Sequence, residues 1–227
     1  MNTRIFITAL FLVSFFTADA QIKNVQMEKC GLTRSVFSRL YTVNVEDVIC
    51  LAQNSDSDIT IFYTFAYWCV PCRKRLPEII RFAEKHNVDF YVLLTSQEGN
   101  RRDVGRALQK FHTEYDNQLN VVIISDSLFS KRAVERLERR ARRGFVLVET
   151  GRLERDKYIN FLAQITPPEM GNIIPGMGIF IVLNRKGEVL LVTNDYQDAQ
   201  NLTGLRSGEA DVKIFERVRQ VIQNSRN

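Results

Sequence analysis

The chain has 227 residues, 45% of them hydrophobic and 25% charged, with a formal net charge of +5. This length and composition suit one globular domain with an elaboration, or at most two small ones. Four cysteines are too few for a disulfide scaffold. Ten Lys or Arg side chains stand against five acids between 131 and 157. Nucleic-acid binding is excluded because this basic stretch lacks interleaved aromatic residues and the chain contains no recognisable nucleic-acid module.

The first twenty residues have the pattern of a cleaved signal peptide. "MNTR" supplies a basic start, residues 5–16 form a 12-residue apolar run, and "ADA" precedes Gln21 as a small-x-small cleavage pattern. The run is too short for a full transmembrane helix, and an uncleaved N-terminal anchor is the alternative. We expect removal of residues 1–20 and export of the mature protein to the periplasm, where disulfides persist.

Buried strands and amphipathic helices alternate along the rest of the chain. Residues 21–58 form a polar N-terminal extension with a short helix at 45–52. Further on, β-branched and aromatic runs predict strands, and apolar residues at helical spacing predict helices. In chain order we expect a strand at 59–66, a helix ending near 87, a strand at 88–95, a helix at 101–115, a strand at 120–125, a hairpin at 178–193 and a closing helix at 212–223.

The stretch 126–172 mixes charged and apolar residues and is expected to form a charged helical insertion before the final hairpin. It contains a charged helical pattern at 128–144 and a shorter one at 157–165. The strand–helix–strand order of 59–95 requires a right-handed crossover and a parallel pair, whereas the hairpin adds antiparallel strands. The predicted class is therefore α/β, with a mixed central sheet and helices on both faces.

Two cysteines, Cys69 and Cys72, flank Pro71 where the first buried strand gives way to a helix. Unsatisfied N–H groups and the dipole at a helix N-terminus favour negative charge, so a thiol there is pushed toward thiolate. Side chains three residues apart on a helix approach to about 5–6 Å between Cβ atoms, which modest adjustment closes to disulfide geometry. One cysteine can therefore attack a disulfide and the other resolve the mixed disulfide. Pro71 stiffens the turn, and Trp68 supplies an apolar shelf beside the sulfur.

The motif "WCVPC", followed by Pro77, resembles the active-site helix of the thioredoxin superfamily. With the expected export and the extra segment before the hairpin, the chain is similar to the periplasmic TlpA/ResA-like thioredoxins. The resemblance implies a thioredoxin-like domain over 59–227, with Cys69 as exposed nucleophile, Cys72 as buried resolving thiol and Pro77 as the proline that kinks the helix. It implies no bound cofactor, because the redox group is the Cys69–Cys72 disulfide itself.

The resemblance also implies partners. These are extracytoplasmic protein thiols and disulfides, with cytochrome c maturation as one setting, and a membrane thiol relay that supplies electrons. We expect the protein to act as a monomer. The function expected is that of an exported thiol–disulfide oxidoreductase, with the direction of electron flow left open.

Three positions depart from the family pattern. The place of the family's cis-proline falls on Gly178, preceded by Met177, unless a longer loop lets Pro175 take that role. Tyr63 stands where thioredoxins bury an aspartate, and Arg75 stands where ResA-like proteins often place a glutamate. Because an opposite charge stabilises a thiolate, Arg75 directed at the sulfurs would make the disulfide more oxidising.

Other interpretations of the cysteines remain. A structural disulfide is the plain alternative for the Cys69–Cys72 pair. A zinc site would need more ligands than two thiolates, and His86 and His112 are expected on helices away from them. A copper-handling protein is a further alternative function, which the shortage of histidines near the dithiol disfavours. We therefore expect no metal. Cys30 and Cys50 either bridge and pin the N-terminal extension or stay separate, with Cys50 as a small buried hydrophobe.

A function of another class is a thioredoxin-like binding protein. In that hypothesis the basic insertion docks an acidic partner or an anionic membrane, and the cysteines are secondary. The side chains that would carry it are the arginines at 139, 140, 142 and 143.

Overall fold

The structure is a computed structural model of the chain. It describes residues 26–35, 38, 40–116, 118–130, 135, 150–171, 176–193 and 207–225. The expected signal peptide, Pro175 and the arginines at 139, 140, 142 and 143 of the basic insertion lie outside the described residues. No described helix is long and apolar enough to cross a membrane.

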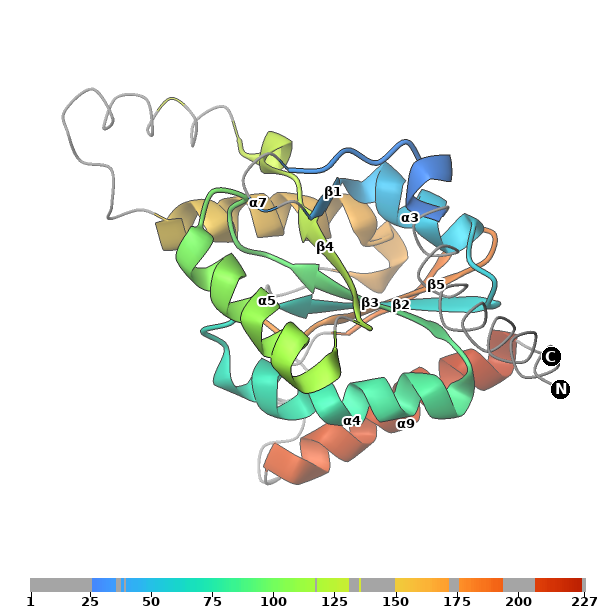
Figure 1. Ribbon diagram of the computed structural model, residues 1–227. Helices are drawn as coiled ribbons and strands as arrows, with labels where there is room; N and C mark the ends of the chain where they lie inside the picture. The colour runs from blue at the N-terminus through green and yellow to red at the C-terminus, as the bar shows by residue number, and fades with distance from the viewer. Residues whose placement is uncertain are drawn as a thin grey trace, which may run out of the picture.

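One mixed sheet organises the described part of the chain, with strand order β1-β4-β3-β2-β5-β6 (Figure 1). The first four strands of this order pair in parallel with their neighbours. Strand β5 is antiparallel to β2, and β6 is antiparallel to β5. In chain order the strands are β1 (Tyr41–Val43), β2 (Ile59–Phe65), β3 (Asp89–Leu94), β4 (Asn120–Ile124), β5 (Phe180–Asn184) and β6 (Val189–Val192). This is a thioredoxin-like α/β fold, which confirms the mixed sheet with its parallel pair and late hairpin.

Helices cover both faces of the sheet, as the sequence predicts (Figure 1). Every residue of β2 is buried, because its alternating side chains enter a separate core on each face. Three helices pack on one face, which are α4 (Val70–His86), α5 (Arg101–Tyr115) and α9 (Ser207–Ser225). Two pack on the other face, α3 (Val45–Gln53) and α7 (Thr150–Ile165). Short 3-10 turns lie at Asp126–Leu128 (η1) and Pro168–Met170 (η2).

The helix α7 lies inside the stretch expected to be an insertion, yet it covers one face of the sheet. Tyr158, Phe161 and Leu162 are buried in its core. The ammonium of Lys157, fully buried, donates to the backbone oxygens of Ser96 and Ile124 at 2.8 Å and pairs with Asp126 at 2.7 Å. Burial lowers the pKa of Lys157, and the charge of Asp126 opposes that shift.

The N-terminal extension contributes an edge strand that the sequence did not predict. Strand β1 pairs in parallel with β4 through Tyr41 to Val43. It is only three residues long, which is too short for a hydrophobic period to register. The helix α3 that follows is close to the expected 45–52, and Asn44 and Asp47 form its capping box.

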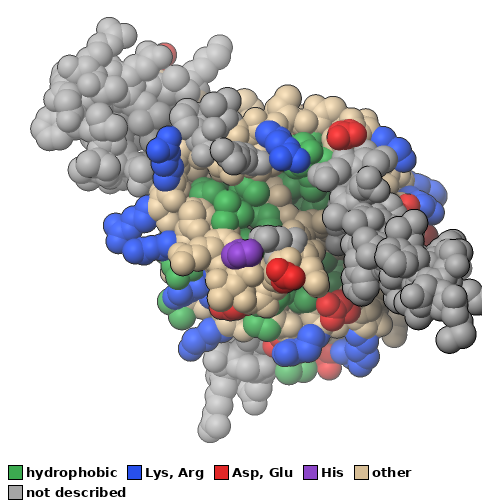
Figure 2. Space-filling view, viewed as in Figure 1, with side chains coloured by type: hydrophobic (Ala, Val, Ile, Leu, Met, Phe, Trp, Pro, Cys, Tyr) green, Lys and Arg blue, Asp and Glu red, His purple; other side chains and the backbone are tan. Residues whose placement is uncertain are grey.

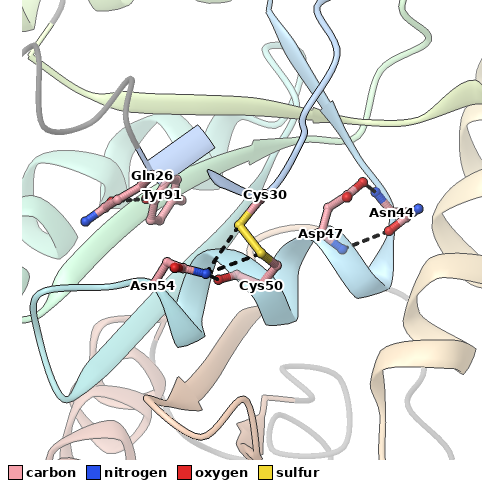
Figure 3. The surroundings of a disulfide bond; sticks show 7 residues. All are labelled: Gln26, Cys30, Asn44, Asp47, Cys50, Asn54 and Tyr91. Carbon is pink, nitrogen blue, oxygen red and sulfur yellow. Dashed lines mark hydrogen bonds between the residues drawn. A yellow bond between two sulfur atoms is a disulfide. The ribbon is translucent and has the colours of Figure 1, made fainter. Parts of the chain in front are cut away.

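Cys30 and Cys50 form a disulfide, which settles the question left open by the sequence (Figure 3). Cys50 belongs to α3, and Cys30 belongs to the segment before β1. The side-chain amide of Asn54 donates to the Cys50 carbonyl at 3.0 Å and lies 3.4 Å from its sulfur. Nearby, the hydroxyl of Tyr91 donates to Gln26 at 3.1 Å. The bridge and this hydrogen bond hold the N-terminal segment against α3 and β3.

The Cys30–Cys50 bridge should contribute to the stability of the whole domain. Closing a loop of 20 residues restricts the unfolded chain, so Cys30→Ala/Cys50→Ala should lower the free energy of unfolding by about 3 kcal/mol. Denaturant titration measures this, with Cys69→Ala/Cys72→Ala as the matched control, whose much shorter loop predicts a smaller loss. An unchanged free energy in Cys30→Ala/Cys50→Ala would contradict the prediction.

Candidate active site

Cys69 is the N-cap residue of α4, placed at the end of β2 by the three residues 66–68. Its backbone is extended, with φ −74° and ψ 97°, and its Sγ accepts a hydrogen bond from the backbone N–H of Cys72 at 3.2 Å. Pro71 lies in the first turn, where the missing N–H leaves no orphan donor. The sulfur therefore occupies the position that a side-chain oxygen takes at other helix starts.

Cys69 and Cys72 form a disulfide, with Cα atoms 5.3 Å apart. Cys69 is 7% exposed, whereas Cys72 is 1% exposed. Cys69 is therefore the more accessible residue of the pair. Reduced, Cys69 would keep its place at the helix N-terminus, where backbone N–H groups stabilise a thiolate. Both properties suit Cys69 as the nucleophile and Cys72 as the resolving thiol.

Gly178 lies directly against the buried sulfur. A Cβ placed on it would lie 3.5 Å from Sγ of Cys72 and 3.0 Å from the hydroxyl oxygen of Tyr63. Its φ of +88° is also a conformation that glycine adopts without strain. No peptide bond among the described residues is cis. Gly178 therefore lies against Cys72 with a trans backbone. Pro175 lies outside the described residues, and which of the two takes the cis-proline place stays a prediction.

The other two departures from the family pattern lie nearby. Tyr63 is fully buried, and its ring packs on Phe180 with centroids 5.1 Å apart. A phenol, not a carboxylate, thus lies beneath Gly178 and close to Cys72. Arg75 follows Cys72 by one turn of α4 and is half-buried; its effect on the thiolate stays a prediction. Pro77 lies inside α4, where its ring removes the hydrogen bond that an N–H would give to the carbonyl of Arg73.

A chain of hydrogen bonds holds the loop that carries Gly178. The N–H of Ile179 donates to the Thr64 hydroxyl at 2.8 Å, and the Tyr158 hydroxyl donates to the Gly176 carbonyl at 2.8 Å. The two hydroxyl oxygens are 3.1 Å apart. Since the phenolic hydrogen is given to Gly176, Thr64 must donate to Tyr158. The loop is therefore fixed from β2 on one side and from α7 on the other.

Apolar side chains lie next to Cys69 in the chain and in the loop that carries Gly178. Trp68 is 58% exposed and Val70 is 46% exposed, and they are the neighbours of Cys69 in the chain. Met177 is half-buried, with its sulfur 3.5 Å from the Thr95 hydroxyl. Exposed apolar groups of this size beside a reactive sulfur suit contact with a polypeptide.

The histidines lie apart from the dithiol. His86 is at the C-terminal end of α4, where its ring packs on Phe82 with centroids 4.4 Å apart, and His112 is on α5. Within the described residues, no three His, Cys, Asp or Glu side chains come close enough together to hold a metal ion.

Thr64 and Tyr158 are site residues that sequence reasoning missed. The signal for Thr64 was a hydroxyl in the middle of the buried run "ITIFYTFA", which requires a partner. Its partner is 94 residues away in the chain, and no local pattern identifies it.

Comparison with known proteins locates similar folds. No protein-family model and no curated protein matches the chain. Among solved structures, it is similar to a secreted Mycobacterium tuberculosis disulfide oxidoreductase homologous to E. coli DsbE, at 15% identity over 60% of this chain and 69% of that one, with a TM-score of 0.34. It is also similar to StoA from Bacillus subtilis, at 17% identity over 62% of this chain and 75% of that one, with a TM-score of 0.31.

A putative thiol-disulfide oxidoreductase from Bacteroides vulgatus gives 20% identity, 66% and 77% coverage and a TM-score of 0.30. The structural neighbours are thus thioredoxin-like thiol–disulfide oxidoreductases at distant identity. Because the TM-scores are low, the fold assignment rests on the strand order of this chain, and the chemistry rests on its own site.

The hydroxyl of Tyr158 should control how tightly the Gly178 loop covers the dithiol. Tyr158→Phe leaves Gly176 without its donor, which should lower the free energy of unfolding by about 1–2 kcal/mol and let dithiothreitol reduce Cys69–Cys72 severalfold faster. Tyr91→Phe is the matched control, because it removes another buried hydroxyl, bonded to Gln26, from a different part of the core. Equal reduction rates in the two variants would show that Tyr158 acts on stability alone.

Proposed function

We propose that this protein is a thiol–disulfide oxidoreductase that exchanges disulfides with partner proteins through Cys69 and Cys72. The observation that carries the proposal is the placement of Cys69 as the N-cap of α4, at the surface end of a disulfide whose other sulfur is buried. A purely structural disulfide needs neither a helix N-terminus nor an exposed apolar rim. A dithiol that attacks another protein uses both.

The exchange follows from the two positions. In the reduced protein, the Cys69 thiolate attacks one sulfur of a partner disulfide, and the other partner sulfur leaves as a thiolate that takes up a proton. The thiolate of Cys72 then attacks Sγ of Cys69, which breaks the mixed disulfide and releases the second partner thiolate. Two electrons have passed to the partner, and Cys69–Cys72 is oxidised. The same steps in reverse oxidise a partner dithiol.

The loop at Gly178 supports a role in partner contact. Its backbone approaches Cys72 closely because no side chain intervenes. Met177, next to Gly178, and Trp68, next to Cys69, add apolar side chains that are partly or largely exposed. An extended partner segment with its own cysteine could lie along this loop. The hydrogen bonds through Thr64 and Tyr158 would keep the loop in one position during the exchange.

The proposal includes export of the protein to the periplasm, where it would act. The basic, apolar and small-x-small pattern of residues 1–20 is that of a signal peptide. The Cys30–Cys50 bridge, formed away from the active site, suits a compartment in which disulfides persist. There the partners would be extracytoplasmic proteins, and a membrane thiol relay would return Cys69–Cys72 to the reduced state.

Replacing one cysteine at a time tests the roles. Cys72→Ala should accumulate a mixed disulfide with a peptide that contains a disulfide, because nothing resolves it, whereas Cys69→Ala should trap none. Mass spectrometry without reductant detects the adduct and identifies the linked cysteine. Cys30→Ala/Cys50→Ala is the control and should turn over as the unaltered protein does. Adducts that form equally in Cys69→Ala would overturn the assignment of the nucleophile.

A further inference from the structure

Two arginines from different helices converge on an aromatic ring next to the dithiol. Tyr67 lies between β2 and α4, two residues before Cys69. The guanidinium carbon of Arg73, on α4, is 4.9 Å from the centroid of the Tyr67 ring, and that of Arg106, on α5, is 6.0 Å away. Contacts of this kind hold an arginine over a ring without neutralising its charge. Positive charge is therefore held at Tyr67, two residues before Cys69 in the chain.

Arg102 extends this positive surface along α5. It precedes Arg106 by four residues, so the two side chains share one face of the helix, and both are exposed. Figure 2 shows Lys and Arg side chains over the left edge of the molecule, where α5 begins in Figure 1. We call Arg73 and Arg106, which contact Tyr67, together with Arg102 on the same face of α5 as Arg106, the arginine cluster.

Within the described part of the chain, no carboxylate pairs with the arginine cluster. Buried Nε of Arg73 has no hydrogen-bond partner there. Asp103 follows Arg102 in the chain, and one of its carboxylate oxygens accepts from the Ser96 hydroxyl. By contrast, Lys110, further along α5, pairs with Glu114. Among the described residues, the three guanidinium groups of the cluster are thus not drawn into an ion pair.

Helix stability does not account for these residues. Positive side chains near a helix N-terminus oppose the helix dipole, which favours acids there. Yet α5 begins with Arg101 and Arg102, with Asp103 as the one acid of its first turn, and the first turn of α4 contains no acid. The arrangement raises positive potential at the edge of the sheet where the dithiol lies, and so favours an anionic partner.

We infer that the arginine cluster selects partner proteins whose disulfides are flanked by acidic side chains. This inference rests on the proposed function and names the substrate class of the same site. Carboxylates beside the partner's cysteine would form charge-assisted hydrogen bonds with the guanidinium groups. Complementary charge would also raise the rate of encounter and hold the partner disulfide next to Cys69.

Peptide disulfides that differ only in flanking charge test this selection. The reduced protein is mixed with peptides carrying Glu, Gln or Lys on both sides of a disulfide-bonded cysteine, and the second-order rate constants are compared. At low salt we expect the order Glu, Gln, Lys, with about tenfold between the extremes. High salt should reduce this ratio, since screening weakens interactions between exposed charges.

Variants that remove charge test whether the arginine cluster causes the preference for acidic peptides. Arg102→Gln/Arg106→Gln should bring the ratio of the Glu and Lys rate constants close to one. Lys213→Gln/Arg219→Gln is the matched control, with the same change of charge on α9 at exposed positions, and should keep the full ratio. Thermal unfolding of both variants verifies that each is folded.

The outcomes separate the two proposals. Equal rate constants for the three peptides, or a ratio that survives Arg102→Gln/Arg106→Gln, would overturn the selection by the arginine cluster and leave the exchange activity standing. Failure of the unaltered protein to exchange with any peptide would overturn the proposed function itself.

Discussion

A sulfur atom caps α4, because the backbone N–H of Cys72 donates to Sγ of Cys69 across 3.2 Å. The first N–H groups of a helix have no partners within it, so the cap stabilises the start of α4 while the disulfide is closed. When the disulfide opens, the same donors and the helix dipole lower the free energy of a thiolate at that position. Folding and reactivity therefore depend on the same contact.

The rest of the molecule fixes this cap in place. Strand β2, buried on both faces, delivers Cys69 to the edge of the sheet. On the opposite face, two consecutive residues of α7 secure that edge. Lys157 reaches the ends of β3 and β4 through Ser96 and Ile124, and Tyr158 reaches the Gly176 carbonyl. The backbone at Gly178 is thereby held against Cys72.

The sequence predicted the parts of the fold that have a strong local signal. Strands β2, β3 and β4 lie in apolar runs that predict buried strands. The two cysteines at a strand–helix junction indicate the dithiol. Strand β1 was missed because three residues are too few to show an alternation of apolar and polar side chains. The helix α7 was predicted only in part because charged residues interrupt its pattern of apolar positions. Lys157 illustrates this difficulty, since its sequence signal is that of a surface residue although it is fully buried.

Contacts between distant segments account for what sequence reasoning left open. The spacing of Cys30 and Cys50 permits a bridge but does not require one, and the packing of the N-terminal segment on α3 decides it. Counting back from the hairpin located Gly178, but its approach to Cys72 depends on hydrogen bonds between β2 and α7. The arginines over Tyr67 come from two helices, so only the tertiary structure brings them together.

The most direct test of the account is an equilibrium titration of the full protein in glutathione redox buffers, with both disulfides followed by thiol alkylation and mass spectrometry. We predict that Cys69–Cys72 is reduced at a potential within the range of known thiol–disulfide exchange proteins, about −120 to −270 mV. Cys30–Cys50 should stay oxidised under the same conditions, as structural bridges do. A Cys69–Cys72 pair that resists reduction as strongly as Cys30–Cys50 would contradict the account, because it would then be a structural bridge as well.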